Sequence, residues 1–578
     1  MTSRSSIVAW SIVALTIASI GTAYSQADSA QTRPALLTSP TFSHDIAPII
    51  FKRCSPCHRP DQVAPFNLLN YSDVKKRTAQ IAEVTSKRIM PPWPPAANYG
   101  HFEAERRLTE NELGVLQQWI VEGAIEGNPA DLPPSPSWPD GWFLGKPDLV
   151  VSMPKPFALA AEGRDAYRNF VVAIPTTERR YVRAVELRPG NARIVHHAFM
   201  FLDQTGQSRR LDGKEAQPGA PYGTQMPAGQ FLSYQPGRMP AMAPDGLAWT
   251  LEKGSYLVLQ AHLKPTGKPE LLQASVGFYF TDHAPTNTPF KVGLTSYTID
   301  IPAGNSNYVV KDSFVLPVDV SAVAVLPHAH YLAREMKGFA SLPDGGTIPL
   351  IHIKNWDFEW QGAYRYAQPV LLPKGSTLSM EFTYDNSTNN ARNPNQPPQA
   401  VIYGEQSSDE MAELWLQLLT RNADDRALLN REYALKNDRV FYERSQFLLK
   451  KSPNDPKGHF TLAVLLLNQK KTAEALRHFK LALEAKPDYQ EAYFTLGVVH
   501  LMNNNLTGAE DAFRNAIRID PEDYRAHGSL GNVFLRMGRM EDAALQFQNA
   551  LRINPNDATA QENLEMIWQA MEKRKKQK

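Results

Sequence analysis

Histidine pairs and a methionine in the middle of the chain are spaced as metal ligands. The segment 326–331 reads LPHAHY, and because successive side chains of a β-strand alternate between its faces, His328 and His330 point the same way. Two neighbouring imidazoles suit copper or zinc. The alternative is a histidine pair on a solvated strand face. We call these residues the two-histidine set.

Three further histidines form a second candidate group, the three-histidine set of His196, His197 and His262. In the run 256–263, alternation places His262 on the face opposite the more apolar one, as a ligand that faces a cleft requires. His196 and His197 are adjacent, so a regular strand would send them to opposite faces. The backbone must bulge or turn there if both bind one metal; otherwise one is a ligand and the other is structural.

The order and local sequences of these histidines, with Met380 downstream, resemble the copper type II, ascorbate-dependent monooxygenases. This is the family of peptidylglycine and dopamine hydroxylases, and the resemblance covers residues 148–405. It implies an electron-transfer copper on the three-histidine set. It implies a second copper, which binds dioxygen and attacks a substrate C–H bond, on His328, His330 and Met380, with Tyr384 on the substrate side. Imidazole serves both copper states and thioether favours Cu(I), which fits this division.

The chain also departs from that family. Leu326 stands where the peptide-amidating branch carries an arginine that grips a peptide carboxylate, so a glycine-extended peptide is not the expected substrate. The disulfides of the family are missing as well, because the chain has two cysteines and both lie in another motif.

That motif, Cys54-Ser55-Pro56-Cys57-His58, is the arrangement to which c-type haem is attached. The two thiols would bond the haem vinyl groups, and His58 would be the proximal iron ligand. A redox dithiol would be expected in a βαβ setting, and a zinc site would need two further ligands nearby. Neither context is evident in the sequence.

Residues 40–127 resemble a small class I cytochrome c. Helices are expected from Phe42 to Arg53 and from Leu108 to Gly123, the second opened by a capping box of Thr109 and Glu112. Met90, in a proline-rich loop, matches the distal iron ligand of that family, and methionine/histidine ligation suits electron transfer. The alternatives are that Met90 only packs, or that His101 is the ligand.

The C-terminal part repeats with a fixed period. Pro453, Pro487, Pro521 and Pro555 are 34 residues apart, and leucine, alanine and phenylalanine positions keep the same interval. This period resembles tetratricopeptide repeats, which present a concave surface to a peptide or protein partner. The four histidines of the repeats fall at varied repeat positions, which indicates structural roles.

The whole chain of 578 residues is too long for one core. Its net charge of +2 and the lack of a long basic stripe argue against a nucleic-acid partner. The first residues read as an export signal, with an uncleaved anchor as the alternative. The expected organisation is a signal peptide (1–25), an α-helical cytochrome c domain (40–127), a proline-rich linker (128–145), two all-β jelly-roll-like sandwiches (146–286 and 287–405), a helical connector (406–452) and an α-solenoid (453–578).

These features together predict an exported, periplasmic, copper-dependent monooxygenase that uses dioxygen on a small organic substrate. It would carry two copper ions and one covalently attached haem c. Electrons would come through the haem, or from an ascorbate-like donor or another redox protein. The alternatives are a haem/copper electron-transfer protein without hydroxylase activity, or a scaffold built on the repeats.

Overall fold

The computed structural model describes the chain from residue 39 to residue 577, with side chains described to residue 573. Excepted are Asp61, Val63, 139–140, 217–220, Tyr222, Gly237 and Glu405. The predicted signal peptide (1–25) lies outside the described residues. None of the described helices is long and apolar enough to cross a membrane.

The N-terminal domain is a small helical bundle that packs around Phe42, Ile46, Ile50, Leu116 and Trp119. The predicted first helix begins as a π-helix and continues as an α-helix, and the predicted capping box of Thr109 and Glu112 is confirmed at the start of the last helix. The elements are η1 (Phe42–Ile46), α1 (Ala47–Arg53), α2 (Tyr71–Lys75), α3 (Thr78–Ser86), α4 (Glu110–Val121) and, in the linker, η2 (Pro129–Asp131).

The first sandwich consists of two four-stranded sheets, in the orders β1-β10-β4-β7 and β3-β8-β5-β6, with a β2-β9 ladder beside them. Every strand pair is antiparallel. The strands are β1 (Leu149–Ser152), β2 (Phe157–Leu159), β3 (Ala166–Ala173), β4 (Arg180–Arg188), β5 (Val195–Asp203), β6 (Ser233–Tyr234), β7 (Trp249–Leu251), β8 (Tyr256–Leu263), β9 (Glu270–Leu272) and β10 (Ser275–Thr281), with a short helix η4 (Gln207–Leu211).

The second sandwich repeats this plan with the sheet orders β11-β20-β14-β17 and β13-β18-β15-β16 and a β12-β19 ladder. Its core holds a large apolar cluster from both sheets. The strands are β11 (Phe290–Thr295), β12 (Asp300–Ile301), β13 (Tyr308–Val315), β14 (Val320–His328), β15 (Ala333–Ser341), β16 (Thr347–Ile353), β17 (Tyr364–Leu372), β18 (Thr377–Tyr384), β19 (Val401–Ile402) and β20 (Glu413–Thr420).

Strand β20 corrects the predicted helical connector 406–452. Its buried residues Leu414, Leu416 and Leu418 alternate with partly exposed ones, which is the two-residue period of a strand. It lies between β11 and β14, so the second sandwich extends beyond residue 405 to Thr420. The long helix α5 (Ala423–Lys451) follows, and its buried Lys436 forms an ion pair with Asp312 of β13.

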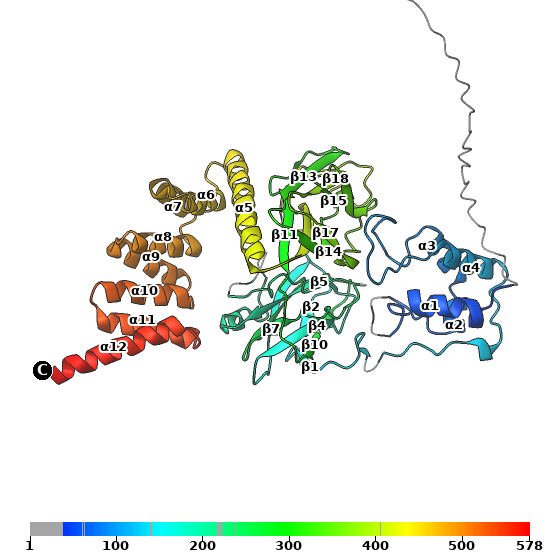
Figure 1. Cartoon of the computed structure of the whole chain (residues 1–578), viewed down its shortest axis with the longest axis horizontal. Coiled ribbons are helices and arrows are strands. Elements are labelled where there is room, and N and C mark those ends of the chain that lie inside the picture. Colours follow the sequence, from blue (N-terminus) through cyan, green and yellow to red (C-terminus); the bar gives the residue numbers. More distant parts are fainter. Residues whose placement is uncertain are drawn as a thin grey trace, which may run out of the picture.

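The C-terminal helices form an array at the end of the molecule opposite the N-terminal domain (Figure 1). Small residues allow close crossings: a Cβ atom on Gly497 would lie 2.7 Å from the ring of Phe513. His459 and His527, two repeats apart, both contact the backbone carbonyl of the proline six residues earlier. The helices are α6 (Pro456–Asn468), α7 (Thr472–Ala485), α8 (Gln490–Met502), α9 (Leu506–Ile519), α10 (Tyr524–Arg536), α11 (Met540–Ile553) and α12 (Ala558–Gln577).

The loop 93–103 of the N-terminal domain is docked on the second sandwich. The backbone N–H of Ala96 donates to the carbonyl of His352 on β16, and that of Glu103 donates to the carbonyl of Arg365 on β17. Phe102 is 7% exposed and lies in the core cluster of that sandwich. The segment that follows Met90 is therefore held by the second sandwich rather than by its own bundle.

Substituting alanine for Phe102 is expected to loosen this docking. The ring of Phe102 stacks on Tyr366 with centroids 5.2 Å apart, and buried Phe→Ala changes cost roughly 3–5 kcal/mol. We expect faster proteolytic cleavage within 93–106, measured on the full chain, while the sandwiches stay intact. Val121, an exposed residue at the end of α4 in the same domain, offers a control as Val121→Ala. An unchanged cleavage rate would show that backbone pairing alone holds the loop.

Candidate functional site

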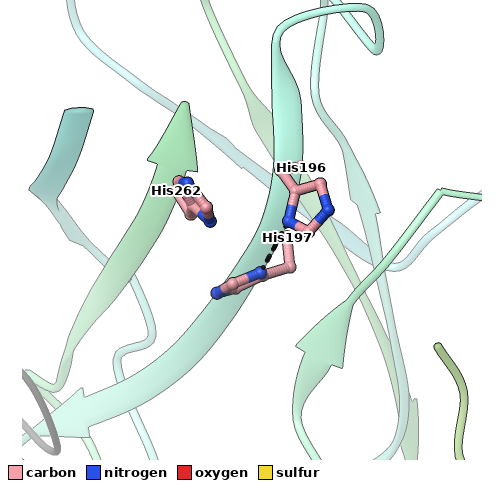
Figure 2. A group of neighbouring side chains, drawn as sticks. All are labelled: His196, His197 and His262. Atoms are coloured by element: carbon pink, nitrogen blue, oxygen red, sulfur yellow. Dashed lines mark hydrogen bonds between the residues drawn. The ribbon is translucent and has the colours of Figure 1, made fainter. Parts of the chain in front are cut away.

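The three-histidine set is assembled by two neighbouring strands, β5 and β8 (Figure 2). The register of this pair shifts between Val195 and His197, so His196 lies in a β-bulge and His197 pairs directly with His262. This confirms the expectation that the backbone bulges between the two adjacent histidines. The bulge turns His196 toward its neighbours instead of to the opposite face.

The nitrogen atoms of these three side chains converge. One ligand atom from each lies within 4.8 Å of the other two. The Nδ1 atoms of His196 and His197 are 3.1 Å apart (Figure 2). The Nδ1 of His262 is buried and has no hydrogen-bond partner. An unpaired buried nitrogen beside two others is the donor set that a copper or zinc ion would satisfy.

Carboxylates hold the outer nitrogens of two of these rings. His262 Nε2 lies 2.7 Å from Asp165 Oδ2, and His196 Nε2 lies 3.4 Å from Glu359 Oε2 of the second sandwich. The bond from His262 lowers the pKa of Asp165, and the bond from His196 lowers that of Glu359 to about 2. A carboxylate that accepts Nε2–H fixes the tautomer whose Nδ1 lone pair is free for a metal.

Two of these histidines, His197 and His262, are held in the neutral form. Burial lowers the pKa of His262, and burial together with the nearby histidines lowers that of His197 well below its usual value. Because the neutral ring is the ligand form, the site is prepared for a cation at neutral pH.

Removal of the Asp165 carboxylate is expected to weaken metal binding at this site. In Asp165→Ala the imidazole of His262 loses its orienting acceptor, and outer-shell changes of this kind cost about 10- to 100-fold in affinity. Competition titration of Cu(II) measures the loss. Glu252→Ala, which breaks an exposed pair with Arg179, is the matched control. Equal affinity in both variants would contradict the orienting role.

The two-histidine set stands at the end of β14 and just beyond it. His328 Nδ1 lies 2.6 Å from Gln361 Oε1, and His330 Nδ1 lies 3.1 Å from the carbonyl oxygen of Asp409. Since both acceptors are oxygens, each Nδ1 carries the proton and each Nε2 keeps its lone pair. Burial, followed by the neighbouring His328, lowers the pKa of His330 to about 3, so this ring is also neutral.

The structure does not bring Met380 to these histidines. Met380 lies on β18, in the other sheet of the second sandwich, is 1% exposed and belongs to the apolar core. It shares a face with Phe382 and Tyr384 as expected, but that face is the inside of the sandwich. Tyr384 is also a core residue with no exposed surface, and its hydroxyl donates to the carbonyl oxygen of Met411 at 2.7 Å. It therefore supports the site from behind rather than facing a substrate.

Met411 is the thioether that lies with the two-histidine set. It lies two residues before β20 and lines the same cavity as His328 and His330. The fully buried carboxylate of Glu410 stabilises this part of the site, because it accepts hydrogen bonds from the backbone N–H groups of His330, Leu332 and Met411. These bonds tie the loop that carries His330 to the residue that carries the thioether.

Both sets face one cavity of about 1090 Å³ between the two sandwiches. Four of the five histidines line it: His197, His262, His328 and His330. The fifth, His196, packs against Phe358, with ring centroids 4.7 Å apart, and Phe358 lies 5.4 Å from the ring of His330. One aromatic side chain thus contacts both sets.

The residues of the haem motif are suited to covalent attachment. Cys54 and Cys57 are free thiols, and the N–H groups of Cys57 and His58 both bond to the carbonyl of Cys54, so the motif forms a single turn after α1. His58 Nδ1 lies 3.1 Å from the carbonyl oxygen of Phe66, which leaves Nε2 for a metal. Burial raises the pKa of Cys54 to about 12. Met90 follows α3 and its N–H bonds to Val84; its role as distal ligand stays a prediction, as does that of His101.

Sequence reasoning missed several residues of this site: Asp165, Phe358, Glu359, Glu410 and Met411. The sequence Asp409-Glu410-Met411 stands just before the alternating apolar and polar residues of 413–420, and this pattern could have indicated that Met411 lies at the start of a strand. The others stand in loops far from the histidines in sequence, so no local pattern indicates them.

Comparison with known proteins identifies the C-terminal region. The family model described as tetratricopeptide repeat matches residues 460–524 and 494–558, which confirms the repeats expected from the 34-residue period. Such repeats indicate a protein partner. Among solved structures, the chain is similar to the crystal structure of MamA at 21% identity, over 24% of this chain and 81% of that chain, with a TM-score of 0.22. No curated protein matches the chain.

Proposed function

We propose that this chain is an exported copper-dependent monooxygenase that hydroxylates a C–H bond with dioxygen and receives electrons through a c-type haem on its own N-terminal domain. The observation that carries the proposal is the cavity onto which two groups of histidines converge from different sandwiches. Copper would supply one-electron redox chemistry at both groups and dioxygen activation at the one with the thioether.

The side chains divide these tasks between the two sandwiches. The three-histidine set offers nitrogen ligands only, which suits an ion that changes oxidation state without activating dioxygen. His328, His330 and Met411 line the open cavity, and their soft sulfur favours the reduced ion. The remaining lining mixes polar side chains with apolar ones, and the apolar ones, including Phe199, Phe201 and Leu326, suit a small organic substrate.

The contacts between domains support delivery of electrons within the chain. Phe358 packs on His196 and His330, so the two sets are connected through one ring. On the other side, Trp93, three residues after Met90, packs edge-on against Tyr364 with centroids 5.5 Å apart. Tyr364 begins β17 and pairs with Val325 of β14, the strand that ends at His328.

A single-turnover experiment tests the proposal. Copper-loaded, fully reduced protein is mixed with oxygen and a panel of small C–H substrates, and haem absorbance, oxygen uptake and product are followed together. We expect haem oxidation, oxygen uptake and hydroxylated product to rise together with one member of the panel, and to be lost in copper-free protein. If the haem stays reduced under these conditions, the internal supply of electrons is wrong.

An electron-transfer protein without hydroxylase activity is the second candidate, and the Phe358 contact between the two sets favours it equally. The same experiment separates the two. Haem oxidation that depends on copper but yields no product from any substrate would support the second candidate. If the chain acts only as a scaffold, copper loading would not change the rate of haem oxidation, and the redox state of the haem would not change copper binding.

A further inference from the structure

A second cavity, of about 300 Å³, lies where the N-terminal domain and both sandwiches meet. Gln62 of the haem-type domain reaches its wall, and the two sandwiches supply the rest. Four arginines line it: Arg183, Arg188, Arg238 and Arg365. It is separate from the cavity that the histidines share, and nothing in the proposed reaction uses it.

The acidic side chain in the wall of this cavity is already engaged. Glu186 accepts the backbone N–H groups of Phe143 and Leu144 at 2.7 and 3.0 Å and the hydroxyl of Tyr279 at 3.1 Å. Its carboxylate is therefore hydrogen-bonded to the linker and to β10 rather than to the arginines. The wall carries an excess of positive charge.

The guanidinium of Arg238 has neutral partners. It donates to the carbonyl oxygens of Ser233 and Phe231 at 2.8 and 3.3 Å and to the hydroxyl of Ser233. Within the described part of the chain, no carboxylate lies within ion-pair distance of it. Arg365 donates to the carbonyl oxygen of Met242 at 2.6 Å and has Glu103 at 3.6 Å.

A partly buried cation without a counter-ion is unfavourable. Burial and the neighbouring Arg365 lower the pKa of Arg238 to about 10, which still leaves it protonated at neutral pH. Leaving a partly buried charge without a counter-ion is unfavourable, and a bound anion would offset that cost. The planar fork of arginine fits a carboxylate through two parallel hydrogen bonds.

The haem motif lies next to this cavity. Gln62, four residues after His58, lines this cavity together with Tyr234. Tyr234 also pairs with Ala198, the residue that follows His197 on β5. A haem attached at Cys54 and Cys57 would belong to the domain whose Gln62 lines this cavity, and haem carries two propionate carboxylates.

We propose that this cavity is a carboxylate-binding site in which Arg238 and Arg365 are the charge partners, and that its favoured occupant is a propionate of the haem. The haem source rests on the function proposed above; the alternative source of the same chemistry is a free small carboxylate. Arg238 and Arg365 would then be positioning residues that also set the haem potential, because nearby positive charge stabilises the reduced, more negative form.

The test uses full-length protein in two forms: the haem-loaded chain and the Cys54→Ser/Cys57→Ser chain, which cannot attach haem. In each, Arg238→Met and Arg365→Met are compared with Arg179→Met, which removes an exposed arginine of the first sandwich. The readouts are the haem midpoint potential, calorimetric binding of succinate, and thermal melting to confirm folding. Denatured-protein spectra report separately whether haem is attached.

With the propionate in the cavity, Arg238→Met lowers the haem reduction equilibrium constant three- to tenfold, about 30–60 mV at 59 mV per tenfold. Succinate then binds only to the haem-free chain, and Arg238→Met weakens that binding at least about tenfold. Succinate binding to the haem-loaded chain with an unchanged potential supports the free carboxylate instead.

Attached haem, no succinate binding in either form and equal potentials in all folded variants would overturn the site. If the protein carries no haem but binds succinate in a way that depends on Arg238, the proposed function is wrong, whereas the carboxylate-binding site is confirmed.

Discussion

Substituting alanine for His262 is expected to reduce the copper content of the protein from two ions to one. The Nδ1 of His262 is the buried, unpaired nitrogen of the three-histidine set, and the other two rings alone would leave the ion short of a ligand. Changes to residues that only orient a ligand already cost about 10- to 100-fold, so removal of the ligand itself should cost at least as much. Metal analysis after dialysis, with Cu(I) and Cu(II) competition titrations, measures the change.

His283→Ala is the control for this substitution, because His283 is an exposed histidine of the same sandwich. It should keep two copper ions and the same melting temperature. The His262 variant should also lose copper-dependent haem oxidation while its second copper stays bound. Retention of two ions with wild-type affinity in His262→Ala would show that these histidines do not form a metal site.

Local patterns were enough to predict the strands and the bulge of the three-histidine set. Alternation in 256–263 separated the core face of β8 from the face of His262, and the adjacency of His196 and His197 required a backbone irregularity that the register shift supplies. The helical repeats could also be predicted from the sequence, because a 34-residue period fixes both the length of the helices and the points at which they cross. In each case the informative residues lie within one element or recur at one interval.

The position of the thioether could not be read in this way. Alternation correctly grouped Met380 with Phe382 and Tyr384, but it cannot tell which face of a strand becomes the core. That depends on which sheet the strand joins: β18 is in the sheet away from the cavity, whereas β20 lies beside β14. The misassignment of β20 as helix hid Met411, whose place is fixed by long-range pairing.

Contacts between the sandwiches were also beyond local reasoning. Glu359 bonds with Lys264 and lies beside His196, and Phe358 packs on rings from both sets, although these residues are nearly 100 or more positions from their partners in the first sandwich. Only the closure of one sandwich on the other creates them. The electron path that we propose depends on this closure and not on any single motif.

The second large effect concerns the thioether. Met411→Leu is expected to lower the Cu(I) affinity of the site formed with His328 and His330 by at least about 10- to 100-fold, since sulfur is the donor that favours the reduced ion. Leucine keeps nearly the same volume, so the fold should lose less than about 1.5 kcal/mol of stability. Anaerobic competition with a Cu(I) chelator, followed by oxygen uptake with reduced protein, measures both consequences.

Met380→Leu is the matched variant, because it makes the same chemical change in the core of the same sandwich. Its Cu(I) affinity and oxygen uptake should equal those of the wild type, and its only effect should be a small shift in melting temperature. The Tyr384 hydroxyl, which holds the Met411 carbonyl, predicts an intermediate case: Tyr384→Phe should weaken Cu(I) binding less than Met411→Leu does. A loss of Cu(I) affinity in Met380→Leu with none in Met411→Leu would reverse the assignment, and would require the two sheets of the second sandwich to pack differently from the arrangement described above.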